Sequence, residues 1–249
     1  MRILVLLQQI LDPAGLMVNR KAGKVFINRE DYLINPADRR ALDAALAIKD
    51  SAGAAVTAAS VGPARAGDAL RQARALGANR AIHLLADSAD EAITARGLAA
   101  LCNSPTLGGF DLILTGDSAL DTGAAIGPRL AEALNFAFLG NADQCSLAGN
   151  VIRVVKAGGK EVHAYEADLP AVVTLSRNAV VATRYAHGGN IITTYRDPDA
   201  VETMTLADLG LADSDLQPVT AERGQSFPPE REFGKQVSLE EIAQRIGRG

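Results

Sequence analysis

The first 134 residues alternate short apolar runs with segments of helical periodicity. Few folds have strands and helices in this alternating order. Apolar runs at 2–7, 54–61, 80–86 and 111–116 have the length of strands, and helical patterns separate them. Strands separated by helices predict βαβ units and a parallel sheet. The runs are almost wholly apolar, which is typical of strands that are covered on both faces. We therefore expect an open, mostly parallel α/β sheet built from βαβ units.

The signals at helix ends support this interpretation. Asn35 is a typical N-cap, Pro36 suits the first helical position, and Gly53 follows the last residue of an apolar stripe. A helix is therefore predicted between Pro36 and Gly53.

The pattern changes after about residue 145. Two alternating runs flank Gly158 and Gly159, which predicts a β-hairpin, and a third run opens with Pro170. We therefore expect the sheet to gain antiparallel strands at its end. From about residue 207 the chain is polar and has few core-forming residues, which indicates an extended arm, either disordered or laid along a partner. The predicted division is a nucleotide-binding α/β domain at 1–206 and a C-terminal arm at 207–249.

Composition and charge exclude several classes of function. Aromatic residues make up only 4% of the chain and Trp is absent, so Ala, Val, Leu and Ile must fill the core. A formal net charge of −4 without a basic stripe argues against binding to nucleic acid. The N-terminal apolar run is too short for membrane insertion. Cys102 and Cys145 lie apart and form no metal-binding pattern with the scattered histidines, so we expect a cytoplasmic protein without a metal centre.

Small residues stand at two predicted strand-to-helix turns, 60–62 and 122–125. In a parallel sheet such turns lie at the carboxyl edge, and helix N-termini there attract phosphate groups. The chain has neither a Walker lysine nor a G-x-G-x-x-G motif, so an ordinary tight turn explains these residues equally well. No pair of nucleophile and base is present, and we predict no catalytic residues.

An ordered series of segments identifies a family. The stretches "RILVLLQQILDP", "YLINPADRRALDAALAIKD", "FDLILTGDSALDTGAAIGPRLAEAL", "LPAVVTLSRN", "RYAHGGNI" and "ETMTLADLGL" follow one another in this chain. Over nearly its whole length the chain resembles the β subunit of electron transfer flavoproteins, which shares the adenine-nucleotide-binding fold called HUP-like. The resemblance implies a heterodimer with an α subunit that holds most of the FAD, and an AMP buried in the β subunit. It also implies electron transfer from a flavin dehydrogenase to a downstream acceptor.

The resemblance also indicates which residues of this sequence would form the binding sites. The residues that would line the nucleotide are Leu6, Asn35, Pro36, Ala37, Ser60, Gly62, Gly116, Asp121, Thr122, Gly123, Ala124 and Ala125. A loop after the Arg-Tyr pair would dock the dehydrogenase, through His187, Gly188, Gly189 and Ile191.

Some family positions differ in this chain. The lysine that the family has after its first strand is Gln8, and the usual phenylalanine after Asn-Pro is Ala37. The leucine of the docking loop falls at about Gly188, so we expect a dedicated partner rather than the usual fatty-acyl dehydrogenases. Two alternatives stay open: an electron-bifurcating type with a second FAD in place of AMP, and a stand-alone nucleotide-sensing α/β module.

Overall fold

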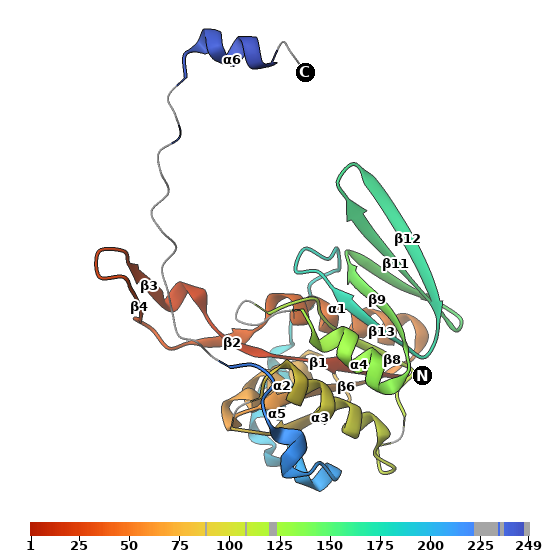
Figure 1. Ribbon diagram of the computed structural model, residues 1–249. Helices are drawn as coiled ribbons and strands as arrows, with labels where there is room; N and C mark the ends of the chain where they lie inside the picture. Colours follow the sequence, from red (N-terminus) through yellow and green to blue (C-terminus); the bar gives the residue numbers. More distant parts are fainter. Residues whose placement is uncertain (88, 108, 120–123, 222–233, 235–236, 247–249) are drawn as a thin grey trace.

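Seven parallel strands form the main sheet of the computed structural model (Figure 1). The structure describes residues 1–249 except 88, 108, 120–123, 222–233, 235–236 and 247–249. Every neighbouring pair in the sheet is parallel, as the sequence predicted. In spatial order the strands are β14 (Glu202–Thr205), β7 (Arg80–Leu85), β6 (Ala55–Gly62), β1 (Arg2–Leu6), β8 (Leu112–Gly116), β13 (Ala171–Leu175) and β9 (Ala137–Ala142).

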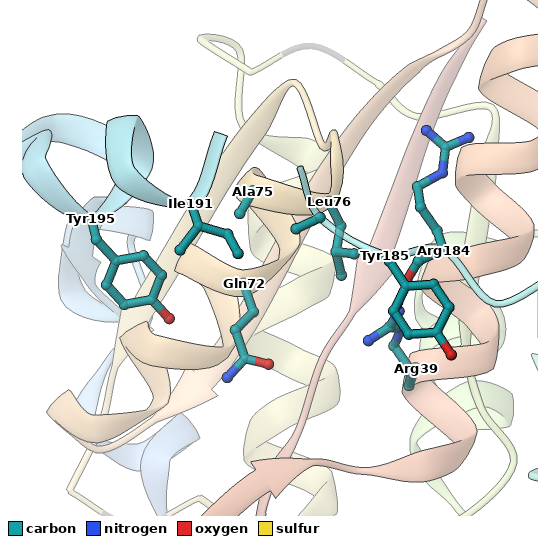
Figure 2. A pocket seen from close by; sticks show the side chains of 9 residues that line it. Arg39, Gln72, Ala75, Leu76, Arg184, Tyr185, Ile191 and Tyr195 are labelled. Carbon is teal, nitrogen blue, oxygen red and sulfur yellow. The ribbon is translucent and has the colours of Figure 1, made fainter. Parts of the chain in front are cut away.

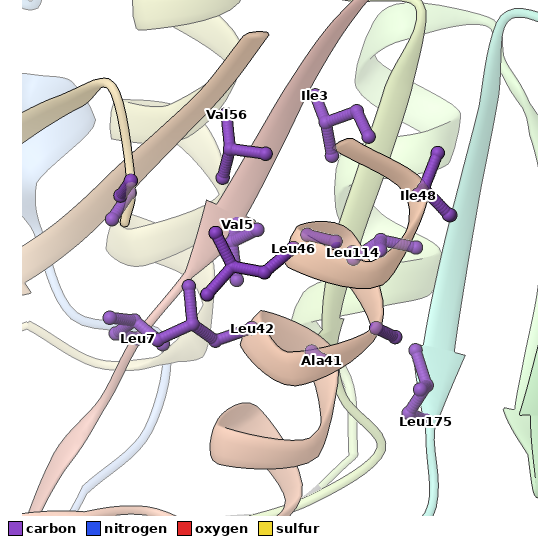
Figure 3. Close-up of a cluster of buried hydrophobic side chains, with 14 of the residues drawn as sticks. Ile3, Val5, Leu7, Ala41, Leu42, Leu46, Ile48, Val56, Leu114 and Leu175 are labelled. Carbon is purple, nitrogen blue, oxygen red and sulfur yellow. The ribbon is translucent and has the colours of Figure 1, made fainter. Parts of the chain in front are cut away.

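Helices cover both faces of this sheet, because successive side chains of each strand point to opposite sides. From β1, Ile3 and Val5 enter one buried cluster while Leu4 and Leu6 enter another. The first cluster, drawn in Figure 3, is completed by α1 (Pro36–Ala52) and α2 (Gly67–Leu76). The second is completed by α3 (Glu91–Asn103) and α4 (Ile126–Leu134).

The predicted ends of α1 are confirmed. Asn35 is the N-cap residue and Pro36 is the first helical residue. Gly53 adopts a left-handed conformation with φ of 66°, and its N–H donates to the carbonyl of Lys49 at 2.9 Å. This is the usual glycine termination of a helix. The stripe that includes Leu42 and Leu46 is fully buried against the sheet (Figure 3).

The third run of the 145–176 region was interpreted wrongly. The predicted hairpin exists as β11 (Val151–Gly158) and β12 (Glu161–Asp168), but with β10 (Gln144–Ala148) it forms a separate antiparallel sheet. The run after Pro170 is β13, which lies between β8 and β9 and is parallel to both. All five residues of β13 are buried, and this burial on both faces is what a strand inside a parallel sheet requires.

An excursion between β1 and α1 forms two small antiparallel ladders. β2 (Gln9–Leu11) pairs with β5 (Tyr32–Ile34), and β3 (Leu16–Asn19) pairs with β4 (Lys24–Ile27). The β3–β4 hairpin projects away from the sheet (Figure 1). The β2–β5 pairing returns the chain to the end of β1, so α1 starts beside that strand end.

The chain beyond β13 includes α5 (Gly188–Arg196) and α6 (Leu239–Ile246). Leu209, Leu211 and Leu216 pack against the second cluster, so residues 207–220 contact the sheet domain. Asp90, the N-cap of α3, also accepts hydrogen bonds from the N–H groups of Val219 at 2.6 Å and residue 220 at 3.0 Å. The division of the chain at residue 207 stays a prediction. Short 3-10 helices lie at Pro13–Gly15, Ala64–Ala66, Pro198–Ala200, Ala207–Leu209 and Asp213–Leu216.

Candidate functional site

The strand order reverses beside β1, which creates a switch point at the carboxyl edge of the sheet. From β1 the chain runs outward through β6 and β7, and then returns to β8 on the other side of β1. Ligands of open α/β sheets bind at such a point. We call the carboxyl ends of β1, β6 and β8, together with the start of α1, the switch-point edge. The predicted residues that strands bring to this edge are Leu6, Ser60, Gly62 and Gly116.

Asn35 fastens the start of α1 at this edge. Its N–H donates to the carbonyl of Gln8 at 2.8 Å, and its side-chain amide donates to the carbonyl of Ser118 at 2.9 Å. Asn35 therefore joins the chain that leaves β1 to the chain that leaves β8. Pro36 occupies the first helical position and Ala37 is buried. Both predicted neighbours of Asn35 thus lie at the switch point as well.

The buried carboxylate of Asp38 also connects the end of β1 to the end of β8. It accepts hydrogen bonds from the N–H groups of Gln8 at 2.9 Å and Gly116 at 2.7 Å, and from the Thr115 hydroxyl at 3.3 Å. Burial raises the pKa of Asp38 to about 6, although these hydrogen bonds favour the ionised form. The positive end of α1 therefore already has an acidic group beside it. An acid in the first turn of a helix was the sequence signal for this residue, and it was not among the predicted site residues.

Gly116 makes the contact between β8 and α1 possible. A Cβ atom at this position would lie 2.6 Å from the Cβ of Ala37 and 2.8 Å from the backbone nitrogen of Asp38. These distances are too short for any side chain, so β8 and α1 can meet only over a glycine. The structure therefore gives Gly116 a packing role, and its predicted contact with a nucleotide stays a prediction.

A buried hydroxyl at the end of β6 has no protein partner. Ser60 is 1% exposed, and its Oγ makes no hydrogen bond within the described part of the chain. The following turn is fixed, because the carbonyl of Gly62 lies 3.0 Å from Nε2 of the buried His83. A buried polar atom without a partner costs free energy, and a ligand group that reached the Ser60 hydroxyl would remove that cost.

The turn between β8 and α4 is only partly described. Asp121, Thr122 and Gly123 lie outside the described residues, so the predictions for them have no structural counterpart. Ala124 is exposed, and Ala125 is the N-cap residue of α4. α4 follows β8 at the carboxyl edge, as predicted. The N–H groups of Ile126 and Gly127 in its first turn have no partner inside the helix, and the third residue, Pro128, has no N–H.

A polar cavity of about 190 Å³ at the ends of β8 and β13 includes residues that the sequence pattern did not indicate. Ser176, Arg177 and Asn178 follow β13 directly and line this cavity together with Asn35 and Asp117. They were missed because β13 was expected to be antiparallel, which would have placed its end elsewhere. The unbroken apolar run 171–175 was the signal that could have corrected this.

Comparisons with known proteins identify the family. The family described as "Electron transfer flavoprotein domain" matches residues 23–190. The electron transfer flavoprotein subunit beta of Clostridium acetobutylicum is 32% identical over 179 residues, which cover 70% of this chain and 68% of the relative. The chain belongs to the electron transfer flavoprotein β-subunit family. Its resemblance to this family, inferred from ordered segments, is confirmed.

Two further relatives extend this similarity. The electron transfer flavoprotein subunit beta of Bacillus subtilis is 28% identical over 246 residues, covering 98% of this chain and 94% of the relative. The caffeyl-CoA reductase-Etf complex subunit CarD of Acetobacterium woodii is 29% identical over 218 residues, covering 85% of this chain and 81% of the relative. Electron transfer flavoprotein β subunits are electron carriers that work with flavin cofactors, and this chain is a subunit of that type. In the described ranges no helix has both the length and the apolar character needed to cross a membrane.

The predicted docking segment of this electron transfer flavoprotein subunit is a helix, not a loop. α5 begins at Gly188, and Nδ1 of the preceding His187 accepts a hydrogen bond from the N–H of Gly189 at 3.2 Å. Ile191 and Tyr195, one helical turn apart, point toward α2 (Figure 2). This packing overrides the preference of two adjacent glycines for a loop. The assignment of His187, Gly188, Gly189 and Ile191 to docking stays a prediction.

Proposed function

We propose that this chain is the β subunit of a heterodimeric electron transfer flavoprotein and that its switch-point edge binds AMP. In this proposal the α subunit holds most of the FAD, and the heterodimer carries electrons in the cytoplasm from a flavin dehydrogenase to a downstream acceptor. The observation that carries the nucleotide site is the Ser60 hydroxyl, which is buried without a protein partner at the carboxyl edge of the sheet, the edge at which α1 begins after Asn35 and α4 follows β8.

These residues suit a nucleotide for different reasons. The Ser60 hydroxyl offers a buried hydrogen bond, and the first N–H groups of α4 offer donors to an anion. The carboxyl of Asp38 beside α1 disfavours a phosphate at that helix end, so we expect the phosphate on the α4 side. AMP has no redox chemistry, and it would stabilise the folded chain by binding only to it. FAD would supply the electron transfer itself, and the residues of this chain would position and shield the cofactors without acting as acid or base.

The C-terminal region is proposed to contact the α subunit. The base of this region is fixed to α3 through Asp90, and α6 presents Leu239 and Ile242 with exposed fractions of 85% and 39%. Such an amphipathic helix buries its apolar face against a partner. Deleting residues 222–249 should weaken pairing with the α subunit and leave the sheet domain folded. Pairing with unchanged affinity would contradict this part of the proposal.

A nucleotide count tests the cofactors. The chain is co-expressed with its α subunit, the purified heterodimer is denatured, and the released nucleotides are separated by chromatography. One FAD and one AMP per heterodimer support the proposal. Two FAD and no AMP would assign the switch-point edge to a second flavin, as in the bifurcating alternative. A preparation with no adenine nucleotide and no flavin would overturn the proposed function.

A further inference from the structure

An arginine and a tyrosine meet at the β6 end of the switch-point edge. Arg65 belongs to the 3-10 helix Ala64–Ala66, which starts two residues after the end of β6. Tyr32 is the first residue of β5, which leads directly to Asn35 and α1. Cζ of Arg65 lies 4.4 Å from the centroid of the Tyr32 ring, which is a cation–π contact. This stacked pair joins the chain that leaves β6 to the chain that enters α1.

The backbone on both sides of the stacked pair is fixed. Tyr32 pairs with Leu11 in the β2–β5 ladder, and its hydroxyl donates to Oε1 of Glu30 at 2.7 Å. On the other side, the N–H of the buried Ala66 donates to the carbonyl of Pro63 at 2.9 Å. The ring and the turn that carries Arg65 therefore have defined positions before any ligand binds.

The guanidinium of Arg65 has no acidic partner. Within the described ranges its side chain forms no ion pair and no hydrogen bond. The acids of the neighbouring excursion are already engaged, because Glu30 accepts the Tyr32 hydroxyl and Asp31 pairs with Arg29. Arg65 is also exposed. The face of its guanidinium that points away from the ring is therefore open to a ligand.

An adenine nucleotide at this edge needs a flat partner for its base. The residues that the strands bring to the edge carry no aromatic ring: they are Leu6, Ser60, Gly62 and Gly116. A guanidinium can take that role, because its plane stacks on bases as well as on aromatic side chains. Arg65 has such a plane, and Tyr32 supports it from behind.

The direction of the nucleotide places the base near Arg65. We expect the phosphate on the α4 side, and α4 follows β8. β6 and β8 flank β1, so two strand spacings, about 10 Å, separate them. This distance is comparable with the length of a nucleoside monophosphate. A phosphate near α4 therefore puts the base at the end of β6, where Ser60 and Arg65 lie.

We propose that the guanidinium of Arg65, supported by the ring of Tyr32, stacks on the base of the bound adenine nucleotide and slows its release. This inference rests on the proposed function of the switch-point edge, and it adds a residue that holds the base. Contacts made only in the bound state act mainly on the dissociation rate, so the rate of release is the quantity to measure.

Exchange of labelled AMP from the intact heterodimer tests this stacking. The heterodimer is loaded with radiolabelled AMP, an excess of unlabelled AMP is added, and the retained label is followed by filter binding. Arg65→Gln should release AMP about tenfold faster, because it removes the stacked plane. Arg65→Lys keeps the charge but not the plane, so it should release AMP about as fast as Arg65→Gln.

A second pair of variants tests the support of the guanidinium. Tyr32→Leu removes the ring and should also speed release, whereas Tyr32→Phe keeps the ring, loses only the hydrogen bond to Glu30, and should release AMP at the native rate. Arg65→Gln combined with Tyr32→Leu should be no faster than Arg65→Gln alone, because both changes remove one shared contact.

The results that would overturn the inference are specific. Release at the native rate from Arg65→Gln would do so, and so would native-like release from Arg65→Lys, because charge alone would then retain the nucleotide. Equal rates for Tyr32→Leu and Tyr32→Phe would also overturn it. The nucleotide count of the native heterodimer reports separately on the proposed function. If that count finds a second FAD in place of AMP, the release of this FAD is followed in the same variants.

Discussion

The switch-point edge is polar and buried, whereas the pocket lined by α2, α5 and residues 184–186, which we call the α2–α5 pocket, is apolar and exposed. At the edge, Asn35 and Asp38 are buried and fixed by hydrogen bonds, whereas at the pocket Tyr185 and Ile191 are apolar and exposed. A buried polar site discriminates strongly, because a wrong ligand or substitution leaves polar groups unpaired. An exposed apolar pocket tolerates substitution and loses mainly binding area. Changes at the edge should therefore alter stability and nucleotide content, and changes at the pocket should alter partner binding alone.

The largest effect is expected from a pair of glycine substitutions. Gly116→Val forces a side chain into a gap where even Cβ would lie 2.6 Å from Ala37, whereas a Cβ atom at Gly188 meets nothing within 4 Å. Overpacking of this kind costs about 3 kcal/mol, so the heterodimer carrying Gly116→Val should melt about 10 °C lower. Gly188→Val is the control and should shift Tm by less than about 2 °C. Scanning calorimetry of both variants measures the difference, and equal Tm values would show that the edge is not the rigid region.

The pKa of Asp38 predicts how stability depends on pH. The folded value of about 6 lies above the ordinary value of 3.8, so the folded chain binds this proton more tightly than the unfolded chain does. The contribution of Asp38 to stability must therefore fall as pH rises from about 4 to 6. In Asp38→Asn this term is absent, and the free energy of unfolding relative to the native chain should rise by about 3 kcal/mol over that window.

Urea unfolding at several pH values measures this change. Asp117→Asn is the control, because it removes a carboxylate that lines the polar cavity but does not join β1 to β8. If the free energy of unfolding varies with pH in the same way for the native chain and for Asp38→Asn, Asp38 is ionised throughout this range. The hydrogen bonds to Asp38 would then outweigh the effect of burial on its pKa.

How far the sequence predicted these two regions depends on which interactions form them. The strands β1, β6, β7 and β8 and the helix α1 were predictable, because an unbroken apolar run and the residues at a helix end, such as Asn35 and Gly53, are local signals in the sequence. The edge strands β9 and β14 were not predicted. The place of β13 was not predictable either, since its pairing depends on strands far away in the chain. Asp38 was missed for a similar reason: its partners Gln8 and Gly116 belong to two other segments.

The α2–α5 pocket could not be predicted from the sequence for the same reason. Sequence alone gives His-Gly-Gly-Asn, which favours a loop, and the helix forms because Ile191 and Tyr195 find α2 beside them. The pocket also needs Arg39 and Asp43 of α1 to hold the segment 184–186. No pattern within residues 184–196 indicates this support, so a pocket could not be inferred before the fold.

A smaller effect is expected from Ser60→Ala. Without AMP the variant should be as stable as the native chain or slightly more stable, because it removes a buried hydroxyl that has no protein partner. With AMP it should lose about 1 kcal/mol of binding free energy, so that about fivefold more AMP is needed for the same rise in Tm. Thr57→Val, which removes a hydroxyl earlier in β6, is the control and should leave AMP binding unchanged. If Ser60→Ala binds AMP like the native chain, the nucleotide does not reach this hydroxyl.

The smallest effect on stability is expected from Gly188→Leu. This variant tests whether partner choice depends on a side chain of this chain that inserts into the dehydrogenase. The new side chain has open space around it and stands at the first position of α5, so Tm should change by less than about 2 °C. If the absence of an anchor excludes acyl-CoA dehydrogenases, adding one should lower the KM for reduction of the heterodimer by such an enzyme, by about tenfold when the leucine is fully buried in the complex. Gly189→Leu, one residue along the helix, keeps the composition and changes the direction of the side chain, and it should leave the KM unchanged. Steady-state reduction assays measure both variants. A native chain that is already reduced quickly, and that keeps this rate when residues 187–196 are replaced by Gly-Ser repeats, would show that α5 and its pocket do not select the partner.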